Sequence, residues 1–159
     1  MQVQLLDLKA QYQSIKDEVD KDVKDVVESQ YFILSEEVTK FEEECAEYTG
    51  VQYGAGVGSG TDALILALRA LDIGPGDEVL TTPFTFFATP EAITSVGATP
   101  VFIDIEPDTY NIDPAKIEGY LESVQGKGSR VKAIMPVHIY GQCADMTKIM
   151  EIAIKYKLK

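Results

Sequence analysis

The sequence is poor in the residues that build metal clusters and disulfide frameworks. Its 159 residues include two cysteines, one histidine and no tryptophan. Cys45 and Cys143 are far apart in the chain, so we predict neither a disulfide framework nor a metal site. No apolar run approaches the length of a membrane span, and residues 1–4 lack the pattern of a signal peptide. We therefore expect a cytoplasmic protein with no membrane partner.

Positive charge is also scarce. The chain has 14 Lys and Arg against 26 Asp and Glu, which gives a formal net charge of −12. This balance disfavours a nucleic-acid partner, because binding to a phosphate backbone needs a basic surface. With 45% hydrophobic and 25% charged residues, the composition is that of a folded globular protein and excludes a disordered chain.

Residues 1–50 are predicted to form an N-terminal helical segment. Apolar residues recur at helical spacing from Ile15 to Val27, and a second helix is expected between the N-cap Ser35 and Gly50. Twelve acidic residues fall within residues 16–47, and we interpret them as the solvated faces of these helices. The apolar segment 31–34 either fills the core beneath the helices or contacts a second subunit.

Residues 51–159 alternate short apolar strands with helices, which is a βαβ pattern. Because the strands are continuously apolar, we predict a mostly parallel sheet covered on both faces, in a three-layer α-β-α domain of the α/β class. The helix at 61–71 is so apolar that we expect it to be buried. The expected strands are 78–82, 101–105 and 132–138, and the other expected helices are 91–96, one opened by Asp113-Pro114, and 145–156.

Four glycines at alternate positions, from Gly54 to Gly60, lead into the helix at 61–71. Free N–H groups at a helix N-terminus bind phosphate, and glycine lets its oxygens approach the main chain. The Ser59 and Thr61 hydroxyls are possible further donors. The spacing fits neither a dinucleotide fingerprint nor a nucleoside-triphosphate loop. The alternative is that Ser59 or Thr61 simply caps the helix, and the glycine pattern alone does not separate these readings.

Two further features are expected at the carboxyl edge of the sheet, where ligands bind in open α/β folds. Phe84, Phe86 and Phe87 follow the strand at 78–82, and an aromatic ring there can lie on a planar ligand, although packing is the more common role. His138, the only histidine, is expected to end the strand at 132–138. Its role can be structural or functional.

The order and spacing of several motifs are more specific than any one of them. Together they closely resemble the N-terminal part of the DegT-like (DegT/DnrJ) nucleotide-sugar aminotransferases, which are pyridoxal-phosphate enzymes of fold type I. The motifs are Leu6-Asp7-Leu8, Phe32-Ile33-Leu34, Phe41-Glu42, Ser59-Gly60-Thr61-Asp62-Ala63-Leu64, Gly74-Pro75-Gly76-Asp77-Glu78-Val79, Thr85-Phe86-Phe87-Ala88-Thr89, Gly97-Ala98-Thr99-Pro100-Val101-Phe102-Ile103-Asp104-Ile105, Asp108-Thr109-Tyr110-Asn111-Ile112-Asp113 and Pro136-Val137-His138-Ile139-Tyr140-Gly141-Gln142.

The resemblance implies that pyridoxal 5′-phosphate is the cofactor. It places the cofactor phosphate on Gly60, Thr61 and Asp62, beside Ser59, and the pyridine ring on Phe86, while His138 is a further candidate for cofactor binding. The implied reaction moves an amino group from a donor such as glutamate to a nucleotide-linked keto sugar. Fold-type-I enzymes build their active sites between two subunits, so a homodimer is also implied.

The resemblance also implies that the catalytic centre is not in this chain. In the family, the Schiff-base lysine and the aspartate that pairs with the pyridine nitrogen follow the stretch that matches here, beyond Lys159. We therefore expect residues 51–159 to be an incomplete cofactor-binding large domain that is inactive alone. Two alternatives stay open: a dehydratase relative that uses the same cofactor without a Schiff-base lysine, and a non-catalytic α/β module that binds a phosphorylated small molecule.

Overall fold

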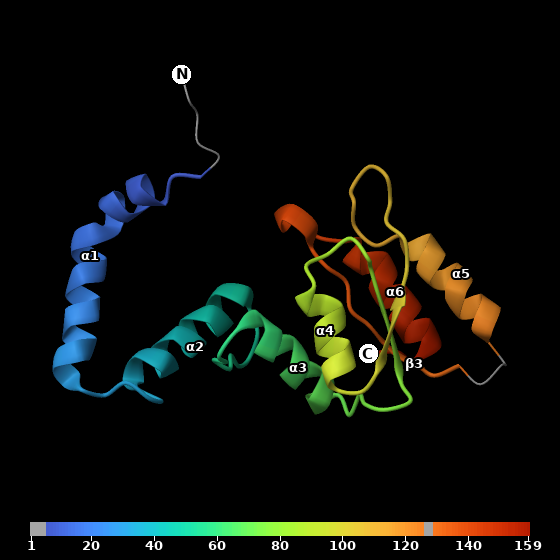
Figure 1. The fold of residues 1–159 in the computed structure, drawn as a ribbon, viewed down its shortest axis with the longest axis horizontal. Coiled ribbons are helices and arrows are strands. Elements are labelled where there is room, and N and C mark those ends of the chain that lie inside the picture. Colours follow the sequence, from blue (N-terminus) through green and yellow to red (C-terminus); the bar gives the residue numbers. More distant parts are fainter. Residues whose placement is uncertain (1–5, 126–128) are drawn as a thin grey trace, which may run out of the picture. The chain divides into compact units, whose positions relative to one another are not determined.

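A computed structural model describes residues 6–125 and 129–159 (Figure 1). The first five residues, which include the stretch without a signal-peptide pattern, lie outside it. The structure divides into two compact units, Met1–Gly56 and Val57–Lys159. No helix in the described ranges combines the length and apolar character needed to cross a membrane.

The first unit contains the helices α1 (Leu8–Ser29) and α2 (Glu36–Thr49). At the start of α1 the Asp7 carboxylate accepts a hydrogen bond from the N–H of Ala10, at 3.0 Å. Ser35 occupies the N-cap position of α2, although its hydroxyl makes no capping hydrogen bond. Gly50 ends α2 in the left-handed conformation, with φ at 72°, as favoured at a helix C-terminus. Both predicted ends of α2 are therefore confirmed.

The first unit buries very little apolar surface. Ala46 is its only buried hydrophobic residue among those described, and α1 buries none. The apolar segment 31–34 is exposed, and Phe32 keeps 56% of its surface. The alternative in which this segment fills the core beneath the helices is therefore wrong for the unit by itself.

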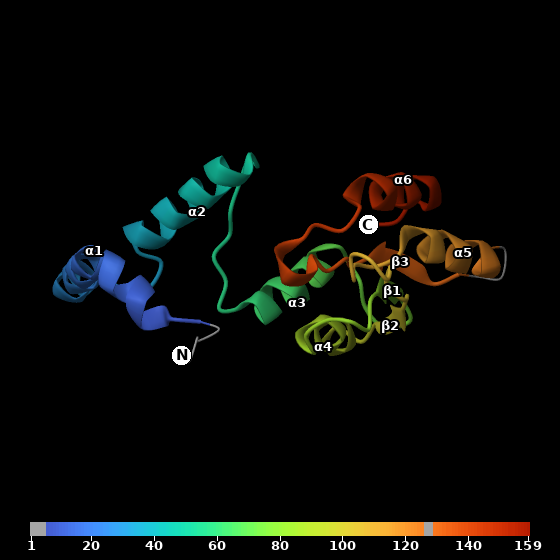
Figure 2. The same ribbon diagram turned by 90° about the horizontal axis from the view of Figure 1, so that it is seen from above.

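The second unit is built on three parallel strands in the order β2-β1-β3 (Figure 2). The strand β1 lies in the middle, with Leu80 opposite Val101 of β2 and Ile134 of β3. The strands are β1 (Glu78–Thr81), β2 (Thr99–Phe102) and β3 (Val131–Ile134), and the helices are α3 (Gly60–Ala70), α4 (Ala88–Ser95), α5 (Pro114–Val124) and α6 (Met146–Tyr156), with a short 3₁₀ turn η1 (Ile139–Gly141).

Helices cover both faces of this sheet, as predicted. Figure 2 shows α6 and α4 on opposite sides of the strands. Because successive side chains of a strand point to opposite faces, Leu80 and Val79 of β1 belong to different cores. The core around Leu80 takes side chains from α5 and α6, and the core around Val79 takes side chains from α3 and α4. The three-layer α-β-α prediction is confirmed.

The predicted burial of α3 is wrong. Only Leu68 of this helix is buried, and Leu66 keeps 49% of its surface. The helix packs on α4 with one side, where Leu64 and Ile65 are partly buried beside Leu68. Its other side has no partner within the described part of the unit. Several apolar side chains of this mostly apolar helix therefore stay uncovered in the unit.

Two strand ends also differ from the prediction. The strand β3 ends at Ile134, so His138 lies four residues past it, in the connection to α6. Pro136 has no N–H group and cannot extend the ladder, which explains the early end. The strand β2 ends at Phe102, and Ile105 instead forms an isolated antiparallel bridge with Ile112. Helix α4 begins at Ala88, three residues before its predicted start.

Candidate functional site

The first turn of α3 is fixed by Ser59, which is its N-cap. The Ser59 hydroxyl oxygen accepts a hydrogen bond from the N–H of Asp62 at 3.1 Å, and lies 3.0 Å from the Asp62 carboxylate, to which it donates. The Ser59 carbonyl accepts the N–H of Ala63 at 3.0 Å. This reciprocal arrangement resembles a capping box. Of the two residues proposed as caps, Ser59 therefore caps the helix, while Thr61 lies inside it.

The same turn has room for an anion at its main chain. The N–H groups of Gly60 and Thr61 precede the first intrahelical donor, so the helix itself gives them no acceptor. A Cβ atom added at Gly60 would meet no other atom within 4 Å. At Gly58, in contrast, a Cβ would lie 2.8 Å from the Asp62 carboxylate. The open surface at Gly60 fits a phosphate that approaches two free N–H groups.

The charges around this turn are not those of a lysine-based phosphate site. No lysine occurs between Lys40 and Lys116, and Arg69 is at the opposite end of α3. The only charged side chain in the first turn is Asp62. Its negative charge interacts favourably with the helix dipole, but it repels an anion. An anion here would depend on backbone N–H groups and the dipole. The assignment of Asp62 to the phosphate stays a prediction, because its own N–H already donates to Ser59.

The connection from β1 to α4 carries the predicted stacking residue. The buried Thr81 hydroxyl donates to the Met135 carbonyl at 2.9 Å, and the buried Thr82 hydroxyl accepts the N–H of Phe84 at 3.2 Å. The Phe86 carbonyl accepts the N–H of Thr89 at 3.1 Å. These bonds hold the backbone of the loop, while the Phe86 ring keeps 80% of its surface exposed.

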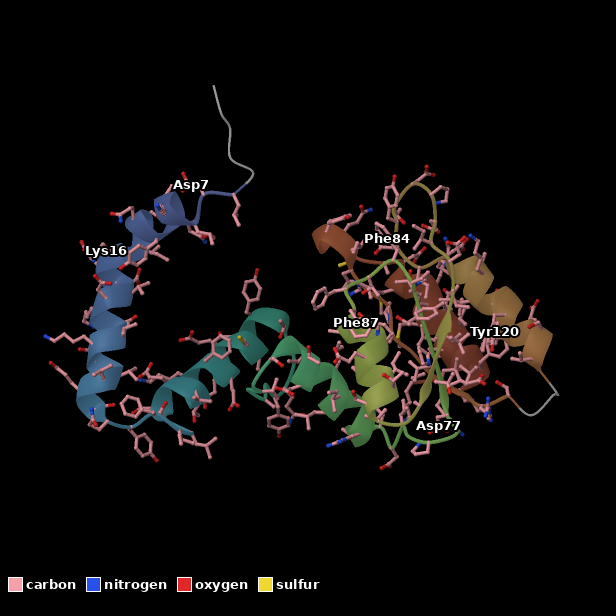
Figure 3. The ribbon with its side chains drawn as sticks, in the orientation of Figure 1. Asp7, Lys16, Asp77, Phe84, Phe87 and Tyr120 are labelled. Atoms are coloured by element: carbon pink, nitrogen blue, oxygen red, sulfur yellow. The ribbon has the colours of Figure 1, made fainter. Side chains whose placement is uncertain are left out.

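The three phenylalanines of this loop have different surroundings. Phe84 packs with rings from the two neighbouring connections, with centroids 5.7 Å from Tyr110 and 6.4 Å from Tyr140. Phe86 and Phe87 are both largely exposed. Figure 3 shows Phe84 and Phe87 at the opposite end of β1 from Asp77. Since Asp77 precedes β1, these rings lie at the carboxyl edge of the sheet, where ligands bind in open α/β folds.

His138 lies in the connection that leaves β3 at this edge. Its Nδ1 atom accepts a hydrogen bond from the N–H of Ala144 at 3.1 Å. The backbone around it is held by Asn111, which comes from the connection between β2 and α5 and is 2% exposed. Asn111 is a functional candidate that the sequence did not indicate, because nothing in its local pattern shows that it is buried between two loops.

Asp104, a carboxylate near the end of β2, is already engaged by the chain. Its Oδ2 atom lies 2.9 Å from Lys116 Nζ, and its Oδ1 atom accepts the N–H of Ile105 at 2.9 Å. The hydrogen bond from Lys116, the backbone hydrogen bond and the lysine charge lower the pKa of Asp104. Asp104 is thus an exposed carboxylate that already pairs with a lysine of its own unit.

The candidate residues lie on three connections of one unit. Helix α3 leads through a short turn into the start of β1, so its first residues are directed toward the end where β1 finishes. Ser59, Gly60 and Thr61 are on α3, Phe86 follows β1, and His138 follows β3. Within the described ranges no hydrogen bond joins the turn at Ser59–Thr61, Phe86 and His138 directly to one another. The arrangement is an open surface with backbone donors, exposed aromatic rings and one imidazole.

Comparison with known proteins identifies a family over most of the chain. The sequence profile of the DegT/DnrJ/EryC1/StrS aminotransferase family matches residues 13–159. A pleiotropic regulatory protein of Geobacillus stearothermophilus is 47% identical over 99% of the chain. A UDP-2-acetamido-2-deoxy-3-oxo-D-glucuronate aminotransferase of Pseudomonas aeruginosa is 44% identical over 97%. The chain spans 41% of the length of each of these relatives.

Solved structures agree with this result. A DegT DnrJ EryC1 StrS aminotransferase from Brucella abortus superposes with a TM-score of 0.95 and 37% identity, over 99% of this chain and 42% of that one. NtdA of Bacillus subtilis, solved with bound cofactor PMP, superposes with a TM-score of 0.82 and 38% identity. That match covers 90% of this chain and 32% of NtdA. The fold expected from the resemblance is confirmed.

Proposed function

This chain belongs to the DegT/DnrJ/EryC1/StrS aminotransferase family, and from that membership we propose that it is part of a pyridoxal-phosphate-dependent aminotransferase. Its substrate is a nucleotide-linked keto sugar, and its amino donor is a compound such as glutamate. The observation that carries the proposal is the open first turn of α3 at Gly60, in the same unit as the exposed Phe86 ring. Such a turn can bind the phosphate of a planar cofactor, and such a ring can stack on its plane.

The proposal gives each candidate residue a separate task. The N–H groups of Gly60 and Thr61 bind the cofactor phosphate, and Ser59 keeps the turn in shape by capping it. The Phe86 ring stacks on the pyridine ring and keeps water from that face. Bound pyridoxal phosphate supplies an electron sink for the substrate carbon. Asp62 and His138 remain candidates at the rim of this site.

The chain's own residues bind and orient but do not supply the reacting amine. No lysine occurs between Lys40 and Lys116, so the phosphate turn and the aromatic loop contain none. Asp104, a carboxylate near the end of β2, is paired with Lys116. The amine and the carboxylate for the nitrogen therefore come from elsewhere in the enzyme. A cytoplasmic location stays a prediction.

The absorbance of the complete enzyme tests this function against its alternatives. We expect a band from cofactor joined covalently to a lysine, and we expect glutamate to remove it as the amino group is transferred. Cofactor that binds without this covalent band would instead indicate the dehydratase relative. A protein with no affinity for pyridoxal phosphate would be the non-catalytic phosphate-binding module, and the proposed function would then be wrong.

We also propose that the enzyme is a homodimer that buries the segment 31–34 at its interface. Tyr31, Phe32, Ile33 and Leu34 are consecutive and all exposed, and the first unit offers no core to receive them. Contiguous exposed apolar residues of this kind mark interaction surfaces. The nearby helices carry much of the chain's negative charge, so the contact rests on the apolar segment and not on ion pairs between like surfaces.

A charge in this segment is expected to dissociate the dimer. The Phe32→Asp variant would bury an unpaired carboxylate at the interface, so we expect at least a tenfold higher dissociation constant in analytical ultracentrifugation. Ile15→Asp, on the α1 surface, is the matched control for added charge, and the same change there should have a smaller effect. A complete enzyme that sediments as a monomer at every concentration would show that the proposal is wrong.

A further inference from the structure

The single histidine of the chain is held by a hydrogen bond whose direction is unambiguous. The backbone N–H of Ala144 can only donate, and it points to Nδ1 of His138 at a distance of 3.1 Å. The Nδ1 atom is therefore the acceptor. In a neutral imidazole one ring nitrogen accepts and the other carries the proton, so the proton of His138 is on Nε2. The loop selects one of the two tautomers.

The proton-bearing side of the ring faces outward from this contact. Nε2 lies across the ring from Nδ1, and the His138 side chain belongs to an exposed residue beyond the carboxyl end of β3. Within the described residues no side chain or carbonyl accepts a hydrogen bond from Nε2. The loop thus offers a fixed donor at the edge of the sheet where the aromatic rings of the β1 connection lie.

The loop that carries this donor is clamped by one buried amide. The Asn111 Oδ1 atom accepts the N–H of Ile139 at 3.2 Å. Its Nδ2 group donates to the carbonyls of Gln142, at 3.2 Å, and Cys143, at 3.4 Å. One side chain therefore fixes the backbone on both sides of η1, directly after His138 and directly before Ala144.

The clamp also holds backbone that is unfavourable by itself. Tyr110, next to Asn111, has φ at 59°, and Tyr140, inside η1, has φ at 53°. Tyrosine rarely adopts this left-handed region, and each such residue costs about 1 kcal/mol or more. Strained residues of this kind persist only where the surrounding structure determines them, and they cluster at functional sites. The strain lies on both loops that Asn111 joins.

We propose that His138 donates a hydrogen bond from Nε2 to an oxygen of the bound pyridoxal phosphate or its substrate adduct, and that Asn111 is the positioning residue that fixes this donor. The proposal rests on the proposed function for the identity of the ligand. The tautomer of His138 and its positioning by Asn111 do not rest on the proposed function, because they follow from contacts within the chain. The two parts can therefore fail separately.

Nuclear magnetic resonance of the imidazole tests the tautomer directly. Because the chain has one histidine, ¹⁵N labelling gives one pair of ring signals, provided that purification uses no histidine tag. In the neutral imidazole we expect the pattern of a single Nε2–H tautomer. Asn111→Asp keeps the acceptor for Ile139 but loses both donor bonds, so we expect it to give signals averaged between tautomers. An averaged or Nδ1–H pattern in the unaltered chain would overturn the proposal.

Titration with pyridoxal 5′-phosphate tests the ligand contact in the same sample. We expect the Nε2–H signal to shift together with the amide signals of Gly60 and Thr61. If the Gly60 and Thr61 amides shift and Nε2–H does not, the ligand contact of His138 is wrong while the proposed function stands. If no signal shifts, cofactor binding by this chain is wrong, and with it the ligand contact of His138, while the tautomer result is unaffected.

Two matched variants of the complete enzyme give a second readout that does not depend on Asn111→Asp folding. The amide nitrogen of glutamine can replace Nε2, and that of asparagine can replace only Nδ1. We expect His138→Gln to keep cofactor affinity within about threefold, and His138→Asn to lose about tenfold or more, because a hydrogen bond to a charged group is lost. Equal affinities for the two variants would overturn the donor role of Nε2.

Discussion

Replacing Gly60 with valine is expected to weaken the binding of pyridoxal phosphate to the complete enzyme about 100-fold. The N–H groups of Gly60 and Thr61 are the free donors of the first turn of α3, and a valine side chain would occupy the open space beside them. A hydrogen bond to a charged phosphate contributes about 1.5–3 kcal/mol, and 1.4 kcal/mol corresponds to a tenfold change in affinity. Losing one or two such bonds gives the expected change, which fluorescence titration of the apoenzyme measures.

At Gly60 an added side chain should exclude the ligand without disturbing the fold. A Cβ atom at Gly60 would meet nothing within 4 Å, so the chain itself has no reason to shift. Ser59→Ala is the matched comparison. It removes the cap of α3, which costs about 1 kcal/mol of stability, but it leaves the Gly60 surface open. We expect only a few-fold loss of affinity there. A Gly60→Val enzyme that binds the cofactor normally would show that the phosphate lies elsewhere.

The start of α3 illustrates what local sequence can predict. Alternating glycines followed by an apolar run indicated a turn that leads into a helix, and the structure places the cap at Ser59. Both readings of this pattern are compatible with the structure, since Ser59 caps the helix while Gly60 and Thr61 keep free N–H groups. Capping and anion binding use different atoms of the same turn.

Burial and long-range contacts could not be predicted with the same success. The composition of α3 indicated a buried helix, yet Leu66 is half exposed, because composition does not say what covers each side. His138 was expected at a strand end, but the missing N–H of Pro136 ends β3 earlier. Asn111 was not selected at all. Its role depends on carbonyls about 30 residues away, which no local pattern indicates.

We also expect that no lysine of this chain forms a covalent adduct with the cofactor. An amine must lose its proton before it attacks an aldehyde, so reactive lysines have lowered pKa values. Here the hydrogen bonds that lysines donate to carboxylates do the opposite. Glu36 and Glu37 raise the pKa of Lys40, Asp145 raises that of Lys148, and Glu118 raises that of Lys155.

The positions of the lysines lead to the same expectation. Lys116 is the first lysine after the aromatic loop, and it is paired with Asp104 at 2.9 Å. Lys40 belongs to α2 of the first unit, where Glu36 and Glu37 hold it. Neither lies on the turn or loop proposed to bind the cofactor. Binding by this chain is therefore expected to be non-covalent and to rest on backbone donors and a stacked ring.

Borohydride reduction of the 159-residue chain with pyridoxal 5′-phosphate tests this central claim most directly. Reduction makes any lysine adduct permanent, so the mass of the denatured chain reports covalent attachment. The account predicts that the amide signals of Gly60 and Thr61 shift saturably before reduction, and that the mass afterwards shows no stoichiometric pyridoxyl group. A stoichiometric pyridoxyl group on one defined lysine, with amino transfer from glutamate, would contradict it.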